Sequence, residues 1–179
     1  MTMSGIVVAV MMAAACGLGV TCEGSEPRKV AFVDTGNTGR SVMAEVLATG
    51  LIAASGAQVA VISRAIDLDP YDVTPEANAA ALVRERGYDV ASHRAAQLSS
   101  NDVRHSDLLL TMTAAHKARL VEAFPEARGK TFTLAEYATG THVDVPDAWG
   151  KPMSAYHDVA TQLDAFLPLA LKKIALGRD

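Results

Sequence analysis

The chain has 179 residues, half of them hydrophobic, and a formal net charge of −4. This length suits a single domain with a substantial core. The acidic balance and the lack of a basic cluster argue against a nucleic-acid-binding protein. The only cysteines are Cys16 and Cys22, so residues 29–179 offer no disulfide framework, thiolate nucleophile or cysteine-based metal site. The five histidines lack the spacing of a metal motif, and we expect no metal.

The N-terminal 28 residues differ in composition from the rest. Residues 1–22 carry no charged side chain and contain an apolar run from Ile6 to Ala15. The run has the length of the apolar part of a signal peptide and is short for a membrane span. "MAAAC" resembles a lipoprotein cleavage site, but no Lys or Arg precedes it, so an uncleaved tail or a start codon placed too far upstream is equally compatible. We expect an N-terminal segment over 1–28, including a polar linker, and one domain over 29–179.

Strand and helix patterns alternate along this domain. Apolar runs predict strands at 29–33, 58–63, 107–113 and 130–134. Apolar residues three and four apart predict helices at 41–55, 75–86, 114–124 and 152–176. Ser41 is predicted to cap the first helix; Thr74 and Pro75 should start the second and Gly87 should end it. The alternation predicts a three-layer, doubly wound α/β fold with a four-stranded parallel sheet flanked by helices.

The loop "DTGNTGRS", from Asp34 to Ser41, joins the first strand to the first helix. Sites in parallel sheets lie at such strand ends. Gly36 and Gly39 would let backbone N–H groups turn inward, the helix N-terminus favours an anion, and Arg40 matches phosphate oxygens. Hydrogen-bonding side chains come from Asn37, Thr38 and Ser41. The loop therefore predicts a phosphate cradle, although the carboxylate of Asp34 would repel phosphate by ~1 kcal/mol per charge pair at about 4 Å in water.

Two known loop types fit this segment poorly. A Walker A loop needs Gly at position 34 and Lys at position 40, and the chain has Asp34 and Arg40. A haloacid dehalogenase loop, D-x-D-x-T, would make Asp34 a nucleophile that forms an aspartyl phosphate with Mg²⁺, but its second Asp is Gly36 here. The second type explains an acid at position 34 and remains an alternative.

The segment "DTGNTGRSVMAE" resembles the signature of the low-molecular-weight protein tyrosine phosphatase family, C-x5-R-S opening a helix and often followed by "PMAE". Only Asp34, for Cys, and Val42, for Pro, depart from it. The resemblance continues through 92–98, 106–142 and 144–167, and so covers residues 29 to about 175. It is closest to the bacterial branch that includes protein arginine phosphatases, in which Thr at the position of Thr38 goes with phosphoarginine and an aliphatic residue with phosphotyrosine.

The resemblance implies a phosphotyrosine protein phosphatase I-like fold and assigns roles by position. Asp34 stands at the nucleophile position, Arg40 would bind the phosphoryl group, and Asp147 would be the general acid. The phosphate-binding loop comprises Thr35, Gly36, Asn37, Thr38, Gly39, Arg40 and Ser41. Ser63 and His93 would support the loop, and Trp149 would form a wall beside the substrate.

The resemblance further implies that no cofactor or metal is needed, that the substrate is a phosphorylated protein or small phosphate ester, and that the protein is cytoplasmic unless residues 1–22 act as a signal. The oligomeric state is left open.

The departures from the family pattern concern the chemistry itself. The attacking thiol is absent; Gly39 replaces a frequent second Cys, Ala148 replaces a Pro, and Arg64 brings a cation near the loop. We expect N–H groups and Arg40 to hold Asp34 ionised and paired, so that it blocks the cradle and attacks poorly. The sequence thus predicts a protein phosphatase with impaired activity. The alternatives are a non-catalytic pseudophosphatase that holds a phosphorylated or cationic partner, and an Mg²⁺-dependent aspartyl-phosphate enzyme. An Asp introduced into an active parent is less favoured, because Gly39 and Val42 depart too.

Overall fold

The structure is a computed structural model that describes residues 26–177. The predictions for residues 1–22 lie outside this range. Its strands are β1 (Arg28–Asp34), β2 (Val59–Ala65), β3 (Leu108–Thr111) and β4 (Thr131–Thr133). Its helices are α1 (Arg40–Ser55), α2 (Ala77–Glu85), α3 (Ser100–His105), α4 (Ala114–Ala123), the 3-10 helix η1 (Pro125–Lys130), α5 (Leu134–Thr139) and α6 (Met153–Ala175).

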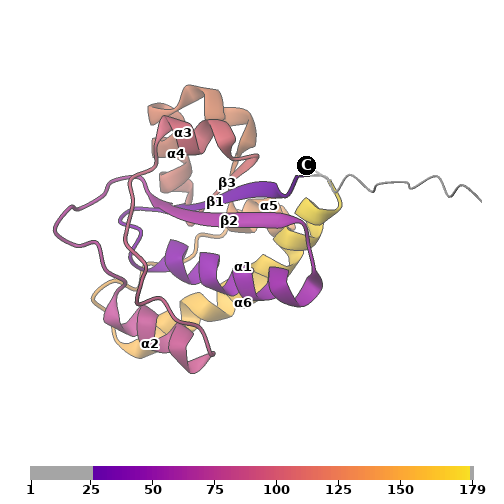
Figure 1. The fold of residues 1–179 in the computed structure, drawn as a ribbon. Coiled ribbons are helices and arrows are strands. Elements are labelled where there is room, and N and C mark those ends of the chain that lie inside the picture. The colour runs from indigo at the N-terminus through magenta and orange to yellow at the C-terminus, as the bar shows by residue number, and fades with distance from the viewer. Residues whose placement is uncertain (1–25, 178–179) are drawn as a thin grey trace, which may run out of the picture.

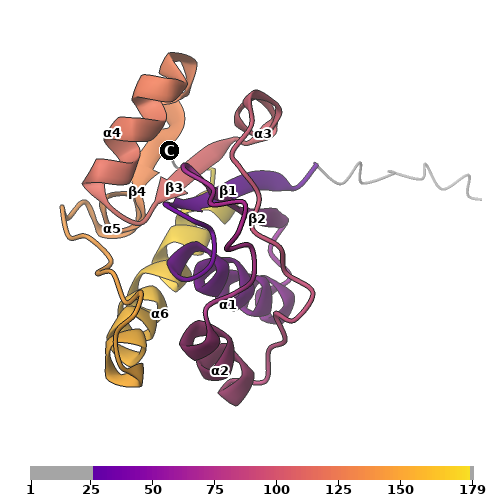
Figure 2. The ribbon, with the colours of Figure 1, turned by 90° about the vertical axis from the view of Figure 1, so that its left-hand side faces the viewer.

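All four strands are parallel and lie in the order β2-β1-β3-β4. Phe32 at the centre of β1 is in register with Ser63 of β2 and Leu110 of β3. The chain leaves β1 toward β2 and then crosses to β3 on the other side, so the connections diverge at the carboxyl end of β1. This end of the sheet, which faces the viewer in Figure 2, is where open α/β sheets bind ligands.

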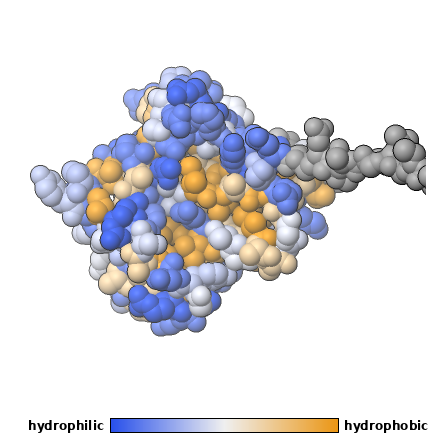
Figure 3. Space-filling view, in the orientation of Figure 1, coloured by the Kyte–Doolittle hydropathy of each residue, from blue (hydrophilic) through white to orange (hydrophobic). Residues whose placement is uncertain are grey.

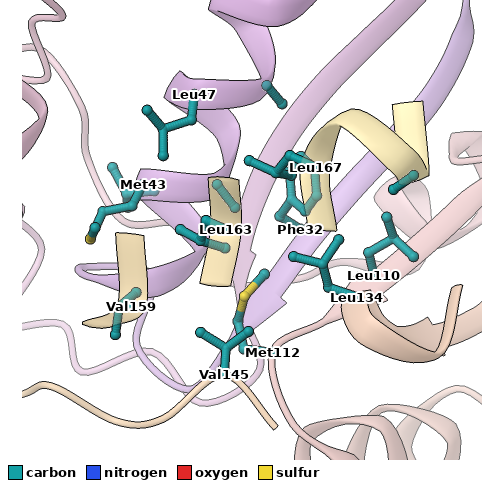
Figure 4. Packing of buried hydrophobic residues seen from close by; sticks show 14 of the residues in the cluster. Phe32, Met43, Leu47, Leu110, Met112, Leu134, Val145, Val159, Leu163 and Leu167 are labelled. Carbon is teal, nitrogen blue, oxygen red and sulfur yellow. The ribbon is translucent and has the colours of Figure 1, made fainter. Parts of the chain in front are cut away.

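Helices cover both faces of the sheet, which confirms the predicted three-layer fold. Helices α1, α2 and α6 lie below the sheet in Figure 1, and α3 and α4 lie above it. The larger core lies on the α1–α6 face, where Phe32 and Leu110 of the sheet meet α6 residues such as Leu163 and Leu167 (Figure 4). A smaller core on the other face joins residues of β1 and β3 to Val103 of α3 and Leu120 of α4.

The structure corrects two predicted helix starts. Helix α1 begins at Arg40 after Gly39, so Ser41 lies inside the helix and its side chain is not the cap. Helix α2 begins at Ala77 after Glu76, not at Thr74 and Pro75. Glu76 has extended backbone angles, φ −52° and ψ 136°, which delay the first helical turn.

Helices α3 and α5 were not predicted, because each has only six residues and shows little periodicity. Their starts do carry a readable signal. Ser99 with Asp102, and Thr133 with Glu136, form reciprocal capping boxes.

The face seen in Figure 3 carries apolar surface across its middle, between hydrophilic regions, where the edge strand β2 lies in Figure 1. Of the helices between residues 26 and 177, none is both long enough and apolar enough to span a bilayer.

Candidate functional site

Three segments from distant parts of the chain meet at the carboxyl end of β1. The first is the loop Asp34–Ser41. The second follows β2 and is joined to the loop because the N–H groups of Ile66 and Asp67 donate to the carbonyls of Asp34 and Thr35, both at 2.9 Å. The third contains Asp147 and is attached beyond β3, where the N–H of Val145 donates to the carbonyl of Met112 at 2.9 Å. The sheet therefore assembles a site from residues more than a hundred positions apart.

Asp34 lies at the base of the loop and is only 3% exposed. One carboxylate oxygen, Oδ1, accepts the N–H of Asn37 at 2.7 Å, and the other, Oδ2, accepts the N–H of Ser41 at 2.9 Å. Ser41 belongs to the first turn of α1, where the helix dipole favours a negative charge. The carboxylate thus ties the loop to the helix with backbone hydrogen bonds.

The expected pairing of Asp34 with Arg40 is wrong. The Arg40 guanidinium instead pairs with Asp147, with 3.3 Å between Nη2 and Oδ1. Its other terminal nitrogen, Nη1, donates to the carbonyl of Val145 at 3.2 Å. The arginine side chain is nearly buried and the Asp147 side chain is mostly exposed. The residues expected to bind phosphate and to protonate the leaving group therefore bind each other.

Asn37 is the residue on which the turn of the loop depends. Its φ of 59° is the only positive φ of a non-glycine residue in the described part of the chain, and neither Gly36 nor Gly39 has a positive φ. The positive φ of this turn therefore falls on Asn37 and on neither glycine. The Asn37 amide nitrogen Nδ2 donates to Ser41 Oγ at 3.0 Å and Ser63 Oγ at 2.8 Å, which holds the strained conformation.

Two other side chains reinforce this turn from behind. The His93 ring nitrogen Nε2 lies 3.0 Å from the carbonyl oxygen of Asn37. The Ser63 hydroxyl, which accepts from Asn37, donates to Glu45 of α1. The structure therefore places the predicted support residues Ser63 and His93 in direct contact with the loop.

Gly39 leaves room for the side chain of Glu76. A β-carbon at this position would lie 3.1 Å from Cδ of Glu76 and closer still to its Oε1. The Glu76 carboxylate accepts hydrogen bonds from the hydroxyls of Thr38, at 3.4 Å, and Tyr156. Burial raises the pKa of Glu76, and the charges of Asp147 and Asp34 raise it further against the opposing effect of the hydrogen bonds. Sequence reasoning missed Glu76, because it follows a Thr-Pro pair that signals a helix start.

His116 is a second residue behind the loop. Its Nε2 lies 2.9 Å from Oγ1 of Thr35, and the side chain is almost fully buried. Burial, followed by the charge of Arg40, lowers the pKa of His116, so the neutral imidazole is favoured. Arg64, expected near the loop, instead places its guanidinium against Asp102 of α3 at 3.1 Å.

A hollow of about 310 Å³ opens above the loop. Arg40 is its only cationic lining residue, whereas six lining residues carry carboxylates: Asp34, Asp67, Asp69, Asp72, Glu76 and Asp147. Trp149 lines the hollow and is 65% exposed. Among residues 26–177, no three His, Cys, Asp or Glu side chains are grouped so that they could hold a metal ion.

A strand–loop–helix cradle at the switch point of a parallel sheet, faced by an arginine and a carboxylic acid, defines a phosphatase-like α/β site. The family model "Low molecular weight phosphotyrosine protein phosphatase" matches residues 29–176. The chain therefore belongs to the low-molecular-weight phosphotyrosine protein phosphatase family.

Two relatives and a solved structure agree with this assignment. The protein-arginine-phosphatase of Geobacillus stearothermophilus is 32% identical, with 83% of this chain and 97% of the relative covered. The low molecular weight protein-tyrosine-phosphatase PtpB of Staphylococcus haemolyticus is also 32% identical, with 75% and 91% covered. A YwlE arginine phosphatase, solved as a Cys-to-Ser mutant with a phosphorylated active-site serine, matches with a TM-score of 0.78 at 32% identity, over 82% of this chain and 95% of that one.

Proposed function

We propose that this protein is a low-molecular-weight phosphatase for phosphorylated proteins whose activity is impaired by the acid at position 34. The observation that carries the proposal is the pair of backbone hydrogen bonds, from Asn37 and Ser41, to the carboxylate of Asp34. The loop, Arg40 and Asp147 supply an oxyanion cradle and an acid. The nucleophile position holds a stabilised carboxylate where the family uses a thiolate.

Two features oppose the binding of a phosphoryl group in this state. Asp34 adds a fixed negative charge at the base of the cradle, where each like-charge pair costs ~1 kcal/mol at about 4 Å in water and more in a drier site. Arg40 would also have to leave Asp147, from which it is separated by 3.3 Å, before its fork could face phosphate oxygens. We therefore expect weak phosphate binding as well as slow chemistry.

Among phosphorylated proteins, we favour phosphoarginine over phosphotyrosine as the substrate side chain. Thr38 stands at the position that goes with phosphoarginine in this family. The hydroxyl of Thr38 lies in a hollow whose many carboxylates suit a guanidinium better than an uncharged phenyl ring. Trp149 at the same hollow supplies a face on which a guanidinium can stack.

The comparisons do not favour the haloacid dehalogenase or pseudophosphatase alternatives. An oxygen nucleophile is nevertheless compatible with the fold, since the solved Cys-to-Ser mutant carries a phosphorylated serine. Asp34 differs from that serine, because a carboxylate that already accepts two N–H groups is a weak nucleophile.

The direct test is turnover by the purified full-length chain. p-Nitrophenyl phosphate and a phosphoarginine-containing protein would be offered with and without Mg²⁺ to the wild type and to Asp34→Ala. Asp158→Ala, which removes an exposed acid of α6, is the matched control. We expect turnover near background in all three proteins. Clear metal-free turnover by the wild type, lost only in Asp34→Ala, would contradict the impairment, and Mg²⁺-dependent turnover would indicate an aspartyl-phosphate route.

A further inference from the structure

Glu76 is brought to the cradle by the fold, although it lies outside the loop motif. It stands immediately before α2, and its backbone N–H donates to the carbonyl of Thr38 at 2.9 Å. This bond joins the start of α2 to the rim of the loop. The side chain of Glu76 lines the same hollow as Arg40 and Asp147.

The carboxyl group of Glu76 is held in one place by its neighbours. It accepts the hydroxyl of Thr38 on one side and the hydroxyl of Tyr156, from α6, on the other. It also fills the space in which a side chain at Gly39 would lie, because a β-carbon there would approach Cδ of Glu76 to 3.1 Å. The rim of the cradle therefore carries a fixed acid where another loop would carry its own side chain.

The charged groups around Glu76 explain what this acid does to a ligand. Asp34 faces it from the loop and Asp147 from the segment before α6, and both charges raise its pKa. Tyr156 faces it from α6, and burial together with Glu76 keeps this phenol neutral by raising its pKa. Arg40, in the same hollow, is already paired with Asp147. An anion that enters the hollow thus meets Glu76 with little positive charge left to offset it.

We propose that Glu76 is a specificity-determining residue of the cradle: its carboxylate disfavours doubly charged oxyanions beside Thr38 and Arg40 and thereby restricts which phosphorylated groups the loop accepts. The inference rests on the proposed function, since it assumes that the loop binds a phosphoryl group. The inference concerns the charge of Glu76. A variant that keeps the shape of this side chain and removes its charge therefore tests the inference.

Sulfate binding to the full-length chain provides the test, because sulfate stays a dianion across the pH range in which Glu76 titrates. The fluorescence of Trp149, the single tryptophan of the chain, would report binding in the hollow. Asp34→Ala opens the cradle, and Asp34→Ser serves the same purpose if the alanine variant does not fold. Glu76→Gln would be added to this background, with Glu85→Gln, an exposed acid of α2, as the control for net charge.

At about pH 8 we expect Glu76→Gln to tighten sulfate binding at least about fivefold, and Glu85→Gln to change it less than about twofold. The affinity of the Asp34→Ala protein should also rise as the pH is lowered through the raised pKa of Glu76, and Glu76→Gln should remove most of that rise. Arg40→Lys in the same background should weaken binding.

Two failures can be told apart. If no Asp34 variant binds sulfate in a manner that depends on Arg40, the cradle itself is refuted and both proposals fall. If Asp34→Ala binds sulfate through Arg40, but Glu76→Gln changes neither the affinity nor its pH dependence, the role of Glu76 is overturned while the proposed function stands.

Discussion

Replacing Asp34 with alanine removes the acceptor of two buried N–H groups, one in the loop and one in the first turn of α1. The hydrogen bonds measure 2.7 Å, from Asn37, and 2.9 Å, from Ser41. Hydrogen bonds to a charged group contribute roughly 1.5–3 kcal/mol each, and a buried donor left without a partner loses its full desolvation energy. Repulsion between Asp34 and the nearby acids offsets part of the stability that these two hydrogen bonds contribute. We therefore expect Asp34→Ala to lower the free energy of unfolding by about 2–4 kcal/mol at neutral pH.

Urea unfolding of the full-length chain, followed by Trp149 fluorescence, would measure this change. An oxyanion should restore much of it, because a ligand at a hundred times its dissociation constant stabilises the folded state by about 2.7 kcal/mol. Asp34→Asn, which keeps the size but can accept only one of the two N–H groups, should fall between the wild type and Asp34→Ala. A loss below about 0.5 kcal/mol in Asp34→Ala, or equal stabilisation of wild type and variant by sulfate, would refute the reasoning.

Three other changes probe the neighbours of the loop. The pKa of Glu76 is raised above 4.5 in the folded chain, so its contribution to the free energy of unfolding is full below about pH 4.5 and is lost as the pH rises through the raised value. Urea titrations at several pH values would measure this decline. Glu76→Gln should flatten it, and Glu85→Gln should not. Gly39→Ala should destabilise by about 1–3 kcal/mol through overpacking against Glu76, and the loss should vanish when Glu76→Ala is added; a loss that persists would contradict the packing argument. Asn37→Ala should lower the unfolding free energy by about 2–4 kcal/mol, since it loses hydrogen bonds and strains a positive φ. Asn37→Gly, free of that strain, should lose less.

The sheet and the longer helices could be predicted, because each has a strong local signal. Apolar runs marked all four strands, and their alternation with helical patterns specified a parallel sheet. The starts of α1 and α2 could not be predicted, because a buried carboxylate from β1 satisfies the N–H of Ser41 and the extended backbone of Glu76 delays α2. Tertiary contacts, which a local pattern does not contain, decided both boundaries.

The composition of the site was predictable from the loop, but its pairing was not. The sequence places Asp34 and Arg40 in the same loop but does not show where their side chains point. An ion pair between them was therefore a reasonable expectation. In the structure, two backbone N–H groups satisfy Asp34, and Asp147, in the segment between α5 and α6, pairs with Arg40. The place of Glu76 in the site could not be predicted either: the local sequence indicates a helix start, and tertiary contacts bring its side chain to Gly39 and Tyr156.

Restoring the missing thiol is the most direct measurement of the central claim, that the acid at position 34 impairs a cradle whose other catalytic groups are present. Metal-free hydrolysis of p-nitrophenyl phosphate would be compared between the wild type and Asp34→Cys, with Arg40→Lys and Asp147→Asn added singly to the cysteine variant. We predict that turnover appears in Asp34→Cys, rises at least about a hundredfold above the wild type, and falls at least about tenfold with either added change. An Asp34→Cys protein that folds and binds sulfate but remains as inactive as the wild type would contradict the claim.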